Sequence, residues 1–190
     1  MRKIASTIVP GIALLIFCLG APVLAVDVPV ATTLNMWIDI KPGGCENPLN
    51  IKGRGVLPAA ILGTETFDVS TINPETVRLV VDGVQIEPIR TAIEDVATPP
   101  ESLPTCSDLC TDTEALPDGF DDLIMKFDTE AIVEALGGWE GVEDGECIVF
   151  QITGTLKDGT THITGQDVVL ILKKGPAPKP PKPPPKGPKK

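Results

Sequence analysis

The stretch CIVFQITGTLKDGTTHITGQDVVLIL, residues 147–172, contains two runs of apolar and β-branched residues separated by Lys157-Asp158-Gly159-Thr160. Such runs are typical of strands, and Asp-Gly supplies the positive φ that a tight hairpin turn requires. The sequence therefore predicts a hairpin, with one strand over residues 147–156 and its partner from Thr161 onward. Val168–Leu172 is predicted as the last strand. This hairpin points to a sheet built from neighbouring antiparallel strands.

Four other stretches also have the composition of strands. They are residues 36–40, the continuous apolar run 55–62, a second hairpin over 77–89 that turns at Asp82-Gly83, and the alternating segment 123–127. Pro58 lies inside the apolar run. Because proline cannot donate to a sheet ladder, Pro58 predicts an edge strand or a bulge.

One helix is expected over Thr129–Leu136, with Asp128 as its N-cap and Gly137-Gly138 as its end. Short strands separated by turns, with a single short helix, favour a mainly β fold over a βαβ arrangement. We therefore expect residues 26–174 to form one domain, a two-layer antiparallel β-sandwich of Ig-like type.

Residues 1–25 have the features of a secretory signal peptide. Arg2 and Lys3 precede an apolar segment over residues 4–20, and Val23-Leu24-Ala25 places small residues where a signal peptidase cleaves. The alternative is an uncleaved membrane anchor, since the segment almost reaches the ~20 residues that a span needs. Pro10 and Gly11 interrupt it and Pro22 follows it, which favours cleavage after Ala25. We expect a secreted or cell-surface protein.

The two ends of the mature chain differ in charge. Residues 26–172 hold all 26 acidic residues and seven basic ones, a net charge of −19, whereas residues 173–190 carry seven lysines. An acidic body argues against nucleic-acid binding, which needs a basic surface. The segment GPAPKPPKPPPKGPKK, residues 175–190, is predicted to be a disordered, extended tail. It either binds an anionic surface, an anionic polymer or the acidic body of a neighbouring copy, or serves only as a solvated tail. The oligomeric state stays open.

Four cysteines follow the signal segment: Cys45, Cys106, Cys110 and Cys147. An even number in an exported domain favours two disulfides, with three possible pairings. Cys106 and Cys110 can close a small ring, in which case Cys45 pairs with Cys147. A thiolate metal site is the alternative, but the chain has no pair of Cys-x-x-Cys motifs and only one histidine.

The segment LPDGFDDLIMKF, residues 116–127, contains part of a calcium-loop pattern. Aligned on the glycine, the ligand positions are the Asp118 carboxylate, the Phe120 carbonyl and the Asp122 carboxylate. The first and third positions fall on Glu114 and Leu116, and leucine cannot ligate; Met125 at the last position excludes an EF-hand. Spacing alone thus indicates half a calcium site, and a Pro-Asp-Gly turn with solvated carboxylates explains it equally well.

Several long motifs resemble a widespread, largely uncharacterised domain of secreted bacterial and archaeal proteins. Its members begin with IDIKPGS-x-PN followed by GV-[IL]-P-VAIL. The matching stretches are WIDIKPGGCENPLNIKGRGVLPAAILGTETFD, INPETVRL, AIEDVATP, DGFDDLIMKF, GECIVFQITGTLKDGT and GQDVVLILKKG, which together span about residues 36–175.

Many relatives read E-D-V-N-G-D-G-x-x-D-L where this chain has an insertion, ATPPESLPTCSDLCTDTEALP, residues 97–117. The resemblance implies Asp95 as the first ligand of a calcium loop that continues at Asp118, Phe120 and Asp122. The middle ligand is then lost or supplied by Asp112 or Glu114. Cys106 and Cys110 lie inside the insertion, where a disulfide would hold it.

Evidence for catalysis is weak. The single histidine, His162, lies among threonines, and paired carboxylates for a hydrolase carry little information in so acidic a chain. Trp37 is expected in the core. Trp139 is the aromatic residue expected near the surface, either as a contact for a polysaccharide or protein partner or as a packing residue at the helix end. We expect a non-catalytic, calcium-stabilised module with a structural or adhesive role. A polysaccharide- or ligand-binding module is the alternative, and a carboxylate-based hydrolase is less favoured.

Overall fold

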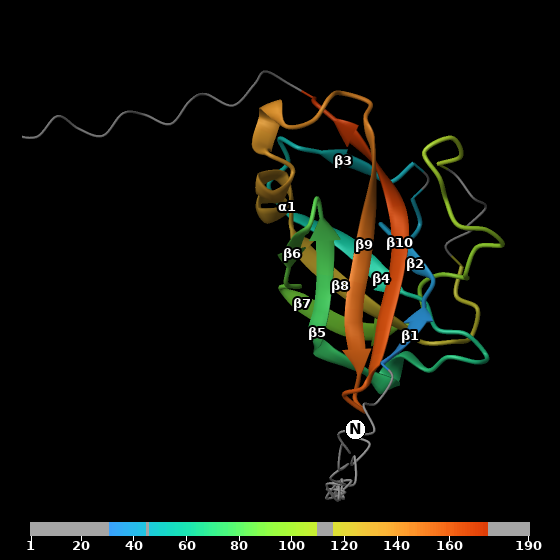
Figure 1. The fold of residues 1–190 in the computed structure, drawn as a ribbon. Helices are drawn as coiled ribbons and strands as arrows, with labels where there is room; N and C mark the ends of the chain where they lie inside the picture. Colours follow the sequence, from blue (N-terminus) through green and yellow to red (C-terminus); the bar gives the residue numbers. More distant parts are fainter. Residues whose placement is uncertain (1–30, 45, 110–115, 175–190) are drawn as a thin grey trace, which may run out of the picture.

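The computed structural model describes residues 31–44, 46–109 and 116–174 (Figure 1). The predicted signal peptide, the predicted tail, Cys45 and Cys110 lie outside these residues. The described chain is mainly β, with strands in two sheets and one α-helix, as the sequence predicts. No helix within it is long and apolar enough to span a membrane.

The larger sheet has six strands in the order β1-β10-β9-β5-β6, and β3 also pairs with β10. Their bounds are Thr32–Asn35 for β1, Pro48–Asn50 for β3, Ile72–Val81 for β5, Val84–Ile86 for β6, Cys147–Leu156 for β9 and Thr161–Leu172 for β10. The β9–β10, β5–β9 and β5–β6 pairs are antiparallel. β1 and β3 pair parallel with opposite halves of β10, so the larger sheet is not purely antiparallel.

The smaller sheet has four antiparallel strands in the order β2-β4-β8-β7. Their bounds are Ile38–Ile40 for β2, Val56–Ile61 for β4, Asp122–Asp128 for β8 and Arg90–Glu94 for β7. In Figure 1 the long strands of the larger sheet stand in front, and the smaller sheet crosses behind them. Buried side chains of both sheets form one hydrophobic cluster, so they share a core.

Both predicted hairpins form. β5 and β6 meet at Asp82 (φ 48°) and Gly83 (φ 79°), the left-handed pair expected of a tight turn. β9 and β10 pair from His162 opposite Thr155 to Leu170 opposite Cys147. Val168–Leu172 was predicted as a separate strand. It is instead the end of β10.

Gly165 has no side chain to add to the apolar residues of β10, yet the strand continues through it. β1 belongs to the larger sheet and β2 to the smaller one, so residues 36–37 carry the chain from one sheet to the other. A Cβ at Gly165 would collide with Ile38 and with the carbonyl oxygen of Met36. Gly165 therefore allows this crossing to lie directly against β10.

The prediction of an edge position for the strand containing Pro58 is wrong. β4 lies between β2 and β8, and Pro58 is opposite Lys126 of β8. The Pro58 carbonyl accepts from Lys41 N at 2.9 Å, so the side of Pro58 that lacks an N–H faces the chain just after β2. There Lys41 adopts φ 61° and its carbonyl accepts from Gly44 N at 2.8 Å. Because β2 ends at this point, the missing donor costs no ladder bond.

The predicted helix is confirmed as α1, Thr129–Ala135, one residue shorter than expected. Asp128 is its N-cap, and the Asp128 carboxylate accepts from Glu130 N at 2.8 Å. Gly137 then takes φ 79°, which ends the helix. Ile132 packs into the shared core, as do Leu123, Met125 and Phe127, the alternating residues of β8.

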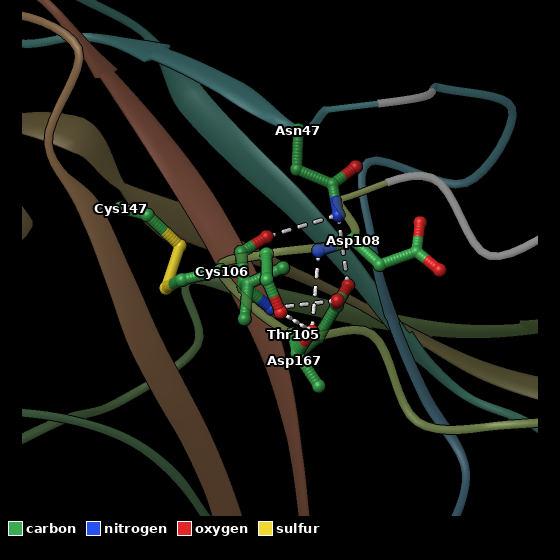
Figure 2. Close-up of a disulfide and its surroundings, with 8 residues drawn as sticks. Asn47, Thr105, Cys106, Asp108, Cys147 and Asp167 are labelled. Atoms are coloured by element: carbon green, nitrogen blue, oxygen red, sulfur yellow. Dashed lines mark hydrogen bonds between the residues drawn. A yellow bond between two sulfur atoms is a disulfide. The ribbon is translucent and has the colours of Figure 1, made fainter.

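A disulfide joins Cys106 to Cys147, the first residue of β9, with their Cα atoms 5.6 Å apart (Figure 2). This pairing excludes both the predicted Cys106–Cys110 ring and the predicted Cys45–Cys147 bridge. The insertion is therefore attached to the larger sheet rather than closed on itself. The two cysteines lie 41 residues apart in the sequence, and only the path of the insertion over the sheet brings them together.

Candidate functional site

The two ends of the insertion meet beside the smaller sheet. β7 and β8 are antiparallel neighbours, with Glu94 opposite Asp122, so the residues that follow β7 and precede β8 lie close together. The Asp95 carboxylate accepts from Asp118 N at 3.1 Å through Oδ1 and from Gly119 N at 2.8 Å through Oδ2. Asp118 Oδ1 in turn accepts from Phe120 N at 3.0 Å. Asp95 thus folds back onto the Asp118 turn, where the resemblance places a split calcium loop.

Asp122 connects three segments from inside the protein. Its side chain is 0% exposed. Oδ1 accepts from Gly63 N at 2.9 Å, and Oδ2 accepts from Val96 N at 2.9 Å and Ala97 N at 3.1 Å. Burial raises the pKa of Asp122, while the three amide donors act in the opposite direction. Asp122 therefore holds the chain that follows β4 and the start of the insertion against β8.

The carboxylates predicted to bind calcium thus all accept backbone hydrogen bonds. A carboxylate has about four lone-pair sites, so these bonds leave capacity on each group. Among the described residues, no group of three or more His, Cys, Asp or Glu side chains is arranged to hold a metal ion. Asp112 and Glu114, the proposed sources of a middle ligand, lie outside the described residues.

A second polar cluster lies where β2 and the loop after it pack against β10, and its residues were not among the predicted site residues. Asp167 Oδ2 accepts from Ile40 N at 2.7 Å and Asn47 Nδ2 at 2.9 Å, and Oδ1 accepts from Val168 N at 2.6 Å. Asn47 Nδ2 also donates to the Val168 carbonyl at 3.1 Å, and Figure 2 shows the Asn47 amide pointing at β10. Asp167 therefore fastens β2 and the loop after it to β10.

Asp39 lies near this cluster and is 5% exposed. Burial raises the pKa of Asp39 to about 7, with further increases from the charges of Asp167 and Asp122. Burial also raises the pKa of Asp167 to about 6, against its three hydrogen bonds. Asp39 Oδ2 and Asn47 Oδ1 are buried and have no hydrogen-bond partner among the described residues. The signal for this cluster was a set of polar residues inside apolar runs, Asp39 in WIDIK and Asp167 in GQDVV.

The two tryptophans are both half-buried. Trp139 lies in the short 3-10 helix η2, Gly138–Glu140, where it packs against the core, and Lys173 Nζ lies 5.4 Å from its ring centroid. Of the two roles expected for Trp139, this placement fits a packing residue at the end of the helix rather than a partner contact. Trp37 packs on Ala60, Leu62 and Ala97, in a small cluster separate from the main core. His162 is exposed on β10, opposite Thr155.

Comparison with known proteins gives no match to this chain, whether with family models, with curated proteins or with solved structures.

Proposed function

We propose that this chain is an exported, non-catalytic β-sandwich module of Ig-like type, with a structural or adhesive role at the cell surface or in an extracellular matrix. We also propose that it is a member of the secreted bacterial and archaeal domain whose motifs it resembles. The shared core of the two sheets supports the sandwich arrangement, since it draws on side chains from both.

The hydrogen bonds made by the buried carboxylates are the observation that supports a non-catalytic role. Carboxylates with raised pKa values often mark active sites, so Asp39, Asp122 and Asp167 are the first candidates for a general acid or base. Asp122 and Asp167 instead accept N–H bonds from the backbone and from Asn47, and both are at most 2% exposed. A general acid or base has to reach its substrate. These groups hold chain segments together, which favours a structural use over the hydrolase alternative.

The Cys106–Cys147 disulfide supports export, because disulfides persist in oxidising compartments outside the cytosol. The basic tail supports attachment, because five lysines over residues 175–190 favour contact with an anionic surface or polymer.

Expression of the full chain with its own leader in a bacterial host tests both halves of this proposal. We expect protein outside the cytoplasm that begins at Val26, as measured by cell fractionation and N-terminal sequencing. We also expect it to be retained on the cell surface at low salt and released at high salt, because exposed charges are screened. A variant lacking residues 175–190 should be exported but not retained. Cytoplasmic protein with an intact N-terminus would contradict export, and salt-insensitive retention of the truncated chain would contradict the role of the tail.

We also propose that calcium stabilises the module at Asp95, Asp118, the Phe120 carbonyl and Asp122. The fold-back of Asp95 onto the amides of Asp118 and Gly119 supports this, since it brings the two halves of the split loop together. Extracellular modules bind calcium with Kd values of about 0.1–1 mM, so 10 mM calcium should stabilise the folded state by about 1–3 kcal/mol.

Thermal melting in 10 mM calcium and in chelator measures this effect. The expected result is a higher Tm with calcium, which is lost in Asp95→Asn because that variant weakens the first ligand. Asp82→Asn is the matched control: it makes the same charge change in the β5–β6 turn and should keep the calcium response. Equal Tm values for the wild-type protein in the two buffers would refute a calcium site.

A further inference from the structure

A groove of about 470 Å³ runs along the place where the chain crosses from β1 to β2. Met36 and Trp37 of the crossing and Leu103 of the insertion supply its apolar surface. Asn35, Gln151 and Gln166 supply amide side chains. Its size lies in the range of small-molecule and cofactor sites, about 300–1,000 Å³.

Several elements fix the shape of the groove. Gly165 lets the crossing lie against β10, which places Trp37 beside the outward-facing side chains of β9 and β10. Leu103 is 46% exposed and lies three residues before Cys106, whose disulfide attaches the insertion to β9. The Gln151 amide donates to Thr164 Oγ1 at 2.9 Å, which orients it beside the groove. The groove is therefore built by the same features that hold the insertion in place.

The groove is uncharged in a strongly acidic protein. None of its lining residues carries a charge, although the chain has a net charge of −10. An anionic ligand would be repelled by the acidic body, and a cation would find no counter-charge in the groove. An indole ring stacks on apolar faces, and amides both donate and accept hydrogen bonds. A sugar ring presents this combination, with C–H faces and hydroxyl groups.

We propose that this groove binds a neutral polysaccharide, with Trp37 as the stacking surface and Gln151 and Gln166 as hydrogen-bonding groups. The inference rests on the adhesive role proposed above and names the class of its partner. It places the contact at Trp37 rather than at Trp139, whose ring packs on the core and lies near Lys173.

Titration of the full mature chain with neutral hexasaccharides tests the proposal. The probes are cellohexaose, xylohexaose, mannohexaose and chitohexaose, with oligogalacturonate as the anionic counterpart. The chain has two tryptophans, so Trp139→Phe leaves Trp37 as the sole indole fluorophore. We expect a saturable change in Trp37 fluorescence with at least one neutral sugar and none with oligogalacturonate.

Exposed amide variants avoid the risk that Trp37→Ala fails to fold. Gln151→Ala and Gln166→Ala should each weaken binding about fivefold, the value of one net hydrogen bond of about 1 kcal/mol. Gln85→Ala is the matched control and should bind normally, because Gln85 is exposed on β6, at the opposite edge of the larger sheet from β1. Calorimetry gives the affinities, and Tm values confirm that the variants are folded.

Three results would overturn the groove assignment: no neutral hexasaccharide binds, affinity is unchanged in both groove variants, or oligogalacturonate binds as tightly. Loss of sugar binding in Trp139→Ala, with both groove variants normal, would move the site to Trp139. These outcomes are independent of cell fractionation, so a failure of the groove is distinguishable from a failure of the exported, surface-attached role.

Discussion

Replacement of Asp122 by alanine is expected to destabilise the protein by about 4 kcal/mol. The wild-type carboxylate accepts from the amides of Gly63, Val96 and Ala97 and is fully buried. Alanine leaves these three donors without a partner, and each unsatisfied buried donor costs about 1–3 kcal/mol. A Cβ at Gly63 would collide with the Asp121 carbonyl, so the chain there has little room to rearrange toward another acceptor.

Urea unfolding measures the free energy of unfolding of this variant. Asp121→Ala is its control, because it removes the neighbouring carboxylate, which is exposed, and should change stability by no more than about 0.5 kcal/mol. Asp122→Asn should also destabilise, since its NH₂ group would face an N–H donor where a carboxylate oxygen now accepts. Equal losses in Asp122→Ala and Asp121→Ala would show that the buried hydrogen bonds do not hold the insertion.

Stability is expected to fall as the pH rises from about 4 to about 7, and Asp39 is the main cause. Its pKa in the folded protein is about 7, against 3.8 for an ordinary aspartate. In this interval the folded state binds more protons than the unfolded state, so raising the pH favours unfolding. Above pH 7 the ionised Asp39 carboxylate costs the folded state up to about 4 kcal/mol. Asp167, with a folded pKa of about 6, acts in the same direction.

The groups that face Asp39 explain the sign of this effect. The charged residues that raise its pKa, Asp167 and Asp122, are both acidic, and burial adds to their effect. Lys41 follows β2 directly, but its Nζ donates to the Pro48 carbonyl at 2.9 Å. Asp39 Oδ2 has no hydrogen-bond partner among the described residues, so ionisation is not compensated there.

Asp39→Asn is therefore expected to stabilise the protein at pH 8 by a few kcal/mol and to leave it nearly unchanged at pH 4.5. Asparagine keeps the shape of the side chain and removes its charge. Asp167→Asn provides the contrast: it should destabilise the protein, because Asp167 accepts three hydrogen bonds. Urea unfolding at pH 4.5, 6 and 8 separates the variants. If Asp39→Asn has the same pH dependence as the wild-type protein, Asp39 is not the group that titrates.

Local sequence signals predicted the elements whose cause is local. Asp82-Gly83 places two residues at positive φ, and β5 and β6 pair on either side of them. Asp128 caps α1 through the amide of Glu130, two residues away. The alternation of Leu123, Met125 and Phe127 corresponds to the buried side of β8.

Features that depend on distant contacts were missed or predicted wrongly. Pro58 indicated an edge strand. However, the Lys41 carbonyl beside Pro58 lies in a left-handed turn and accepts from Gly44 N, so no ladder hydrogen bond from residue 58 is missing. β7, Arg90–Glu94, has exposed residues throughout, so no buried alternation marked it as a strand. Cys106 and Cys110 are close in sequence, yet the disulfide goes to Cys147 because the insertion comes within bonding distance of the first residue of β9.

The candidate sites follow the same division. The resemblance to a secreted domain, rather than spacing, pointed to Asp95 as a partner of Asp118, and the antiparallel pairing of β7 and β8 brings the two together. The uncharged groove combines Trp37, Leu103 and Gln151 from three distant parts of the chain. No sequence pattern joins such residues.

By itself, then, the sequence determined the mainly β class of the fold, the β5–β6 and β9–β10 hairpins and helix α1, because turn residues, caps and side-chain alternation act over a few neighbouring residues. The tertiary structure alone decided the order of the strands, the disulfide pairing, and the roles of Asp39, Asp122 and Asp167. An exposed carboxylate is hydrated and ionised at neutral pH. When packing buries it, the charges and hydrogen-bond donors around it decide whether it ionises. Asp167 and the Ile40 amide it accepts from are separated by 127 residues, a distance over which local patterns carry no information.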